Sequence, residues 1–308
     1  METSSSSSNK PALSVHVIFN ASSGTAPADP QTIRETFSQY PHVSCAVHES
    51  SSGRDIDHIT KKALQAGADV IAAAGGDGTV SSVAHLLVEK ETPLAILPLG
   101  TRNHFARDLG IPSDLSAAVE VVCSGKTVPI DVAEVNGRYF VNNVSLGAYA
   151  DVVQLRDRWK PIIGKWPGMG LAIFALLFRM PWLPLQVEWK GHLIRRFVPL
   201  LFVGNNPYES RLKDIGKRLD LNKGVLWLMV PKETGVWGRI RAIAYALAGH
   251  MYDTSDIDVA EIKELVVRSP RRSMIIGLDG EALRSKMPLV FRSHPGALRV
   301  RAPNDVQP

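Results

Sequence analysis

The sequence predicts an α/β plus mainly β fold: an N-terminal parallel, three-layer α/β domain and a C-terminal antiparallel, β-sandwich-like domain with inserted helices. In the first part of the chain, short β-branched runs alternate with helical patterns, as they do in βαβ units. After about residue 125, strand-like runs follow one another with turn dipeptides between them. We therefore expect a tail at 1–12, an α/β domain at 13–125, a β-rich domain at 126–303 and a tail at 304–308.

Composition excludes several classes of protein. The 308 residues are 45% hydrophobic and 21% charged, which is enough apolar material for one large or two ordinary domains and excludes disorder throughout. Cys45 and Cys123 are too few for a disulfide scaffold, and with no apolar leader after Met1 we expect a reducing cytoplasm. The longest apolar run, Met169 to Phe178, is about half of what a bilayer needs, so no membrane span is expected.

The first domain reads as four strands separated by helices. Parallel sheets of this type bind ligands beyond the carboxyl ends of their strands, so loops at these ends are the first candidates for a site. The expected strands are Ser14–Phe19, Val43–Val47, Asp69–Ala73 and Leu94–Leu97, and the expected helices lie near Pro30–Tyr40, Arg54–Ala66 and Thr79–Glu89.

The second domain begins with a hairpin, because Asn136-Gly137 favours a tight turn between two strand-like runs. These runs are Thr127–Val135 and Arg138–Ser145. Two helices are expected around Trp166–Phe178 and Val236–Met251. Further strands are expected at Leu185–Trp189, Leu193–Val203, Val225–Val230, Asp258–Arg268, Met274–Leu278 and Pro288–Arg292, with turns at Lys190-Gly191 and Asp279-Gly280.

A glycine-rich turn comes directly after an expected buried strand and opens an expected helix. Its residues are, in order, Gly75, Gly76, Asp77, Gly78 and Thr79. Backbone amides at such a turn can approach an anion closely, and a helix N-terminus favours negative charge, so the turn indicates a phosphate site. The alternative is a tight turn in which Asp77 or Thr79 only caps the helix. The spacing matches neither the dinucleotide fingerprint nor the P-loop, which disfavours both of those classes.

A second loop leaves the next strand and carries Gly100, Thr101 and Asn103. Because the carboxyl ends of parallel strands share one edge of a sheet, we expect the two loops to lie together. Taken alone, Thr101 and Asn103 could be ordinary capping residues.

With these motifs in place, the chain resembles the bacterial members of the diacylglycerol kinase family of lipid kinases, relatives of sphingosine and ceramide kinases and, more distantly, of NAD kinases. The resemblance implies ATP-dependent transfer of the γ-phosphoryl group to a hydroxyl of a membrane lipid, such as diacylglycerol or a sphingoid or other lipid alcohol. ATP and Mg²⁺ are the implied cofactors, with 13–125 as nucleotide-binding domain and 126–303 as lipid-acceptor domain. The matching segments are Phe19–Gly24, Gly75–Thr79, Pro98–Ala106, Phe140–Gly147 and Leu278–Glu281.

The resemblance also implies roles for individual residues. Glu281 matches the proton acceptor of bacterial relatives, and Asp77 matches a catalytic or metal-associated aspartate near the metal of MgATP. Thr101 would contact the nucleotide and Asn103 would support its loop. An isolated Asp-Gly-Glu would be a hairpin turn, so the role of Glu281 depends on the other motifs. The nucleotide phosphates would be held by Asn20, Gly75, Gly76, Asp77, Gly78 and Thr79.

Four departures from the family pattern affect these expectations. Glu49 stands where relatives carry a nucleotide-contacting threonine, and Ser50 is the available substitute. Lys223 replaces an acidic ligand of a structural Mg²⁺, so we predict no structural metal site there, with Asp220 as the nearby carboxylate available to pair with the lysine. His104 occupies a position where many relatives carry aspartate, and its role is left open. Ala21, where proline is usual, should cost only loop stiffness.

The net charge of +5 favours anionic partners, and the segment Arg156–Trp189 interleaves tryptophans and basic residues with an apolar stripe. We expect this segment to contact an anionic membrane surface, with a domain core or dimer contact as the alternative. The predicted protein is thus cytoplasmic and peripherally membrane-associated, and a homodimer is left open.

No nucleic-acid motif is present, so nucleic acid is not expected as a partner. The competing functions are a related kinase for a soluble alcohol, as in NAD kinases, and a catalytically inactive nucleotide-binding regulatory module.

Overall fold

A computed structural model describes residues 13–21, 29–147, 183–198, 200–208, 218, 220–232 and 257–305. The two expected helices at 166–178 and 236–251 lie outside these residues, as does most of the expected membrane segment. The backbone divides into two compact units, a first unit of Met1–Val128 with Arg299–Gln307 and a second unit of Pro129–Leu298. In the described residues, no helix combines the length and the apolar character needed to cross a bilayer.

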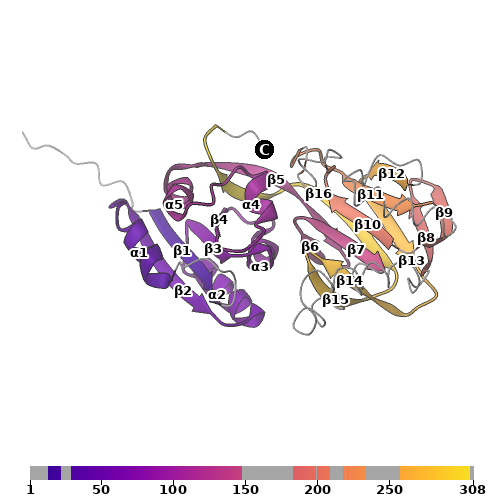
Figure 1. Cartoon of the computed structure of the whole chain (residues 1–308), viewed down its shortest axis with the longest axis horizontal. Coiled ribbons are helices and arrows are strands. Elements are labelled where there is room, and N and C mark those ends of the chain that lie inside the picture. Colours follow the sequence, from indigo (N-terminus) through magenta and orange to yellow (C-terminus); the bar gives the residue numbers. More distant parts are fainter. Residues whose placement is uncertain are drawn as a thin grey trace, which may run out of the picture. The chain divides into compact units, whose positions relative to one another are not determined.

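The first unit is built on a parallel sheet with the strand order β2-β1-β3-β4 (Figure 1). Every residue of β3 and β4 is buried, which explains why both read in the sequence as unbroken apolar runs rather than alternating ones. The last residues of β16 (Leu289–Ala302) extend the sheet, since Val300 pairs in parallel with Leu94. The strands are β1 (Leu13–Asn20), β2 (Val43–Ser50), β3 (Val70–Gly75) and β4 (Leu94–Pro98).

Helices cover both faces of this sheet. The connection from β1 to β2 runs in the opposite direction to the connection from β2 to β3, so right-handed crossovers place α1 and α2 on opposite faces. Accordingly α1 packs with α5, whereas α2 packs with α3. The predicted three-layer α/β architecture is therefore confirmed. The helices are α1 (Pro30–Phe37), α2 (Gly53–Gln65), α3 (Asp77–Leu87), α4 (His104–Asp108) and α5 (Leu115–Ser124).

The second unit contains two antiparallel sheets. One has the order β16-β13-β8-β9, with β5 paired to β16 and β6 paired to β5, and the other has the order β12-β11-β10-β7-β14-β15. Remaining strands of the first sheet are β5 (Lys126–Val135), β6 (Arg138–Phe140), β8 (Leu183–Trp189), β9 (His192–Val198) and β13 (Glu264–Arg268). Those of the second are β7 (Asn143–Gly147), β10 (Leu200–Asn205), β11 (Leu226–Pro231), β12 (Ile257–Ile262), β14 (Ser273–Leu278) and β15 (Glu281–Lys286).

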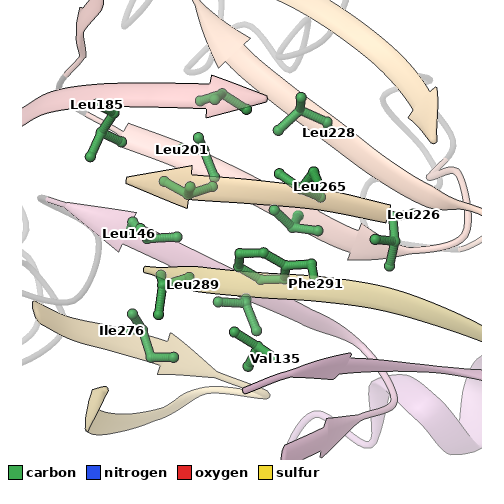
Figure 2. Packing of buried hydrophobic residues seen from close by; sticks show 14 of the residues in the cluster. Val135, Leu146, Leu185, Leu201, Leu226, Leu228, Leu265, Ile276, Leu289 and Phe291 are labelled. Carbon is green, nitrogen blue, oxygen red and sulfur yellow. The ribbon is translucent and has the colours of Figure 1, made fainter. Parts of the chain in front are cut away.

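One hydrophobic core joins the two sheets of the second unit (Figure 2). The first sheet contributes residues such as Leu185, Leu265 and Phe291, and the second contributes residues such as Leu146 and Leu201. Alternation along β8, where buried residues are separated by more exposed ones, directs one side of that strand into this core. The antiparallel, sandwich-like second domain is therefore confirmed.

Three hairpin turns predicted from dipeptides are confirmed. In each turn both residues have positive φ, as a type I′ turn requires, and the second residue is a glycine that tolerates this region without strain. The turns are Asn136-Gly137 (φ +48° and +81°), Lys190-Gly191 (+43° and +80°) and Asp279-Gly280 (+48° and +90°).

Several strand boundaries differ from the prediction. The run expected as one strand at Leu193–Val203 contributes to both β9 and β10, and these strands belong to different sheets. Asp258–Arg268 likewise divides into β12 and β13. A run of strand-forming residues shows only that the chain is extended, so it does not reveal where the chain passes from one sheet to the other. Trp189, part of the expected membrane segment, is partly buried against the core.

Truncating a core aromatic residue tests the sandwich. Phe291 is fully buried and meets Phe140 edge-on, with ring centroids 6.5 Å apart. We expect Phe291→Ala to lower the free energy of unfolding by about 3–5 kcal/mol, because it removes buried apolar surface and leaves a cavity. Val259→Ala, on the 45% exposed Val259, should change it by about 0.5 kcal/mol or less. Urea denaturation measures both, and equal effects would contradict the assigned core.

Candidate functional site

The candidate site of the first unit starts where β3 meets α3. The strand ends at Gly75, and α3 begins at Asp77 with Gly76 as its N-cap residue. No side chain forms a capping hydrogen bond there, in contrast to α1, α2 and α5, which Asp29, Ser52 and Asp114 cap. The amides of the first turn of α3 are thus not capped by a side chain, and a helix N-terminus of this kind suits an anion.

The loop after β4 lies directly against this turn. A Cβ atom added to Gly100 would lie 2.4 Å from the Cα of Gly76 and 2.7 Å from Oδ1 of Asn103. No side chain fits in that space, so glycine at position 100 is a requirement of the fold. The expected meeting of the two loops at one edge of the sheet is therefore observed.

Asn103 holds the second loop in shape. Its backbone is in the left-handed region at φ +48°, a conformation that asparagine tolerates better than most residues. Its Oδ1 accepts a hydrogen bond from the Gly100 amide at 3.0 Å, and its Nδ2 donates to the carbonyl oxygens of Pro98 at 3.0 Å and Gly100 at 2.7 Å. Thr101 is exposed within this braced loop.

Two further contacts connect the loops with their neighbours. The Nδ2 atom of Asn20, at the end of β1, donates to Oγ1 of Thr79 at 3.0 Å. Oδ1 of Asp77 accepts from the Phe105 amide at 3.3 Å, which links the start of α3 to α4. Thr79 is buried, so its hydroxyl group supports the turn. The structure thus brings Asn20, the turn at 75–79 and the Asn103 loop together, while their roles toward a nucleotide stay predictions.

Glu49 and Ser50, at the end of β2, differ in their exposure to solvent. Glu49 is exposed, and Ser50 is 3% exposed with its Oγ donating to the carbonyl oxygen of Phe19 at 3.2 Å. The hydroxyl group of Ser50 is therefore already engaged within the sheet.

His104 is the first residue of α4. Its Nδ1 lies 2.7 Å from a terminal nitrogen of Arg107, so Nδ1 is placed to accept from the guanidinium group. Burial lowers the pKa of His104, an effect that the charge of Asp77 opposes and the charges of Arg107 and Arg102 reinforce. His104 is accordingly neutral at neutral pH.

Glu281 lies in the second unit, at the first position of β15 after the Asp279-Gly280 turn. The residue is exposed overall, yet protein atoms around its carboxylate withdraw it partly from water. This desolvation, together with the negative charge of Asp279, raises the pKa of Glu281 above the ordinary value of 4.5.

Asp279 has a structural function that the sequence did not reveal. Asp279 is 7% exposed, and its carboxylate accepts three backbone hydrogen bonds, from Val141 at 2.9 Å, Asn142 at 2.8 Å and Asn143 at 3.0 Å. Its own amide donates to the carbonyl oxygen of Asn143 at 2.9 Å. The Asp-Gly-Glu hairpin is therefore tied to the start of β7, a segment far away in the sequence.

A second buried carboxylate belongs to Asp131 of β5, which is 2% exposed. Its Oδ2 accepts from Nδ2 of Asn206 at 3.0 Å and from the Gly224 amide at 2.5 Å, and its Oδ1 accepts from the Gly296 amide at 2.9 Å. This group fixes three distant segments of the second unit. The one available signal was an aspartate between the apolar residues Ile130 and Val132 of a strand-like run.

Lys223 stands where the family resemblance implies an acidic ligand of a structural Mg²⁺. It pairs with Glu261, and the Nζ atom of Lys223 lies 2.7 Å from Oε1 of Glu261. Asp220 is therefore not its observed partner; Oδ1 of Asp220 accepts from the Asn222 amide at 2.7 Å. Within the described ranges, no group of three histidine, cysteine or acidic side chains could hold a metal ion. The expected loss of a structural Mg²⁺ site stays a prediction.

The close approach of the two glycines can be tested directly. We expect Gly100→Ala to lower the free energy of unfolding by about 1–3 kcal/mol and to speed hydrogen exchange of amides 98–103, because its methyl group must displace the Gly76 backbone. Gly53→Ala is the matched control, since a Cβ there meets nothing within 4 Å. If both variants were as stable as the parent protein, the two loops would not be packed as described.

Comparison with known proteins assigns the family. Residues 14–135 match the model of the diacylglycerol kinase catalytic domain. A diacylglycerol kinase of Bacillus subtilis strain 168 is 30% identical over 246 residues, covering 77% of this chain and 78% of the relative. One from Staphylococcus aureus strain Newman is 26% identical over 249 residues, covering 80% and 78%.

Solved structures share the fold. A crystal structure of a diacylglycerol kinase from Bacillus anthracis strain Sterne superimposes with a TM-score of 0.66 at 21% identity, covering 94% of this chain and 97% of the other. Another structure from that strain reaches 0.74 at 22% identity, covering 96% and 100%. The chain belongs to the diacylglycerol kinase family and is a phosphotransferase with an alcohol group as acceptor.

Proposed function

We propose that the protein is an ATP-dependent lipid kinase that transfers the γ-phosphoryl group to a hydroxyl of a membrane lipid, such as diacylglycerol or another lipid alcohol. The observation that carries this proposal is the pair of glycine turns at the ends of β3 and β4, which approach so closely that Gly100 has no room for a side chain. The curated relatives, which are named diacylglycerol kinases, favour a lipid acceptor.

The first unit would hold the nucleotide. The uncapped first turn of α3 offers backbone amides to phosphate oxygens, and Gly75, Gly76 and Gly78 leave room for the phosphates to approach the main chain. Asn20 and Thr79, linked to each other, would fix one side of this turn, and Asn103 would hold the loop from which the exposed Thr101 reaches the nucleotide. Within the predicted division of the chain, 13–125 thus binds the nucleotide and 126–303 accepts the lipid.

A carboxylate beside the phosphates is suited to Mg²⁺, which prefers oxygen ligands and keeps several waters. Asp77 is the candidate, because it opens the helix that would bind the phosphates. When bound, the metal would supply neutralisation of the phosphate charge during transfer.

Glu281 would act as general base. As the lipid hydroxyl oxygen bonds to the γ-phosphorus, its proton passes to the Glu281 carboxylate and the bond from phosphorus to ADP breaks. The raised pKa increases the proton affinity of this carboxylate.

Two carboxylate variants test these roles. We expect Glu281→Gln to lower kcat by about 10²- to 10⁴-fold while leaving the affinity for an ATP analogue unchanged, because only the base is lost. Asp77→Asn should lower kcat and also weaken MgATP binding. Their matched controls are Glu264→Gln and Asp57→Asn, both of exposed residues. Phosphate transfer from radiolabelled ATP to a lipid extract is the assay, with identification of the labelled product.

The same assay decides between functions. Labelled lipid product supports the proposal, whereas transfer only to a soluble alcohol such as NAD would replace it with a related kinase activity. Nucleotide binding without transfer to any acceptor would indicate a regulatory module. Full activity of Glu281→Gln would remove Glu281 from the mechanism.

The pH dependence of kcat/KM reports on the base. Because desolvation and Asp279 raise the pKa of Glu281, we expect activity to be lost, as the pH falls, around a midpoint above 4.5. The deprotonated form is the active one, so activity rises with pH through this midpoint. A profile whose acid limb lies at or below 4.5 would contradict the assignment, provided that unfolding is excluded over the same range by circular dichroism.

We also propose that the enzyme works in the cytoplasm and makes transient contact with an anionic membrane surface. Its substrate lipid resides in a bilayer, and the net charge of +5 attracts the protein to anionic headgroups.

A further inference from the structure

Three large apolar side chains are most exposed in the described part of the chain, and two of them share one strand. Phe197 is 56% exposed and Leu193 is 50% exposed, both on β9, while Val259 on β12 is 45% exposed. The strand β9 forms the edge of its sheet, next to β8 (Figure 1). This edge strand therefore concentrates exposed apolar surface in one place.

Alternation along β9 directs these residues to the same side. Leu193, Arg195 and Phe197 are exposed, whereas Val198 is buried in the core between the sheets. The outward residues lie opposite residues 188, 186 and 184 of β8 respectively, which are also on the side away from the core. The side of the sheet that faces away from the core thus carries two apolar groups with an arginine between them.

An open hollow of about 450 Å³ lies on this part of the sheet. The residues that line it include Pro184, Gln186, Arg195, Phe197 and Arg268. We call these residues together with Leu193 the β9 face.

The charges around the hollow are mostly positive. Within the described residues, no carboxylate forms an ion pair with Arg195, and the carboxylate of Glu188 lies 4.0 Å from Nε of Arg268. Arg196 also lines the hollow, but Asp258 neutralises it at 2.5 Å. Two more exposed arginines, at positions 271 and 272, follow Arg268 in the chain. The β9 face therefore combines apolar groups with an excess of arginine.

We propose that the β9 face docks on a bilayer that contains anionic phospholipid. Leu193 and Phe197 would enter the boundary between headgroups and acyl chains, and Arg195 and Arg268 would bind headgroup phosphates around the hollow. This inference rests on the proposed function, because a kinase for a membrane lipid has to meet the bilayer. Two residues of the β9 face, Pro184 and Gln186, belong to the segment Arg156–Trp189 that is expected to contact the membrane, whereas Leu193, Arg195, Phe197 and Arg268 follow that segment in the chain.

The positive charge of the β9 face favours an anionic bilayer over a second copy of the chain as its partner. Two copies paired symmetrically through their β9 faces would bring their arginines toward each other, and like charges at a contact are unfavourable. Anionic headgroups offer opposite charge instead, together with an apolar layer at the depth that an aromatic and a leucine side chain can reach.

Co-sedimentation of the full chain with vesicles tests the proposal without turnover. The vesicles are phosphatidylcholine with or without phosphatidylglycerol. We expect binding that needs phosphatidylglycerol and falls with added salt, because exposed charges are screened. The double variant Leu193→Ser/Phe197→Ser should bind at least about tenfold more weakly, as should Arg195→Glu. Val259→Ser and Lys61→Glu are the matched controls for lost apolar surface and reversed charge, and both should bind like the parent protein.

Activity toward a short-chain, water-soluble acceptor separates this inference from the proposed kinase function. The β9 variants should retain that activity and lose activity on vesicles. Parent protein that phosphorylates the soluble acceptor without binding anionic vesicles would overturn the docking surface and leave the kinase proposal standing. β9 variants that bind vesicles like their controls would overturn it too, as would a dimer, detected by sedimentation velocity, that only these variants dissociate.

Discussion

The first unit depends on a space that no side chain can occupy. The turn after β3 and the loop after β4 meet where Gly100 lies against Gly76, and a Cβ atom at position 100 would lie 2.4 Å from the neighbouring Cα. Since protein interiors are close-packed, such an overlap could be relieved only by moving the main chain. Asn103 holds the second loop in place, because its side-chain amide bonds to the Gly100 amide and to the carbonyl oxygen of Pro98. The packing of the two glycines thus fixes the spacing between the turn that opens α3 and the loop after β4.

Much of this frame could be predicted from the sequence, because its signals are local. Buried parallel strands appear as continuous apolar runs, as at 70–75 and 94–98, and Asn-Gly, Lys-Gly and Asp-Gly dipeptides carry the positive φ values of three hairpins. The loops at the ends of β3 and β4 could be placed together because both strands run in the same direction. Strand β15 was not predicted, because most of its residues are exposed and only its pairing with β14 identifies it as a strand.

The side-chain contacts that could not be predicted join residues far apart in the chain. Asp279 bonds to amides more than 130 residues away, and the Asp131 carboxylate reaches the Gly224 and Gly296 amides. Closeness in sequence indicates Asp220 as the partner of Lys223, whereas the observed partner, Glu261, lies on β12. Sequence distance is a poor guide to such pairs, because strand register brings distant side chains together. The same limit applies to the two runs that divide between sheets.

Asp279 connects the packing of the second unit with its chemistry. A carboxylate that accepts three backbone amides is well satisfied although it is buried, and an apolar side chain in its place would leave those amides without acceptors. The negative charge that these amides stabilise is also one of the causes that raise the pKa of Glu281, two residues later. The residue that fastens the hairpin to β7 therefore also increases the proton affinity of the carboxylate beside it. Because one buried charge has both effects, the proton affinity of Glu281 is coupled to the integrity of the turn, and a change at Asp279 alters the fold and the pKa together.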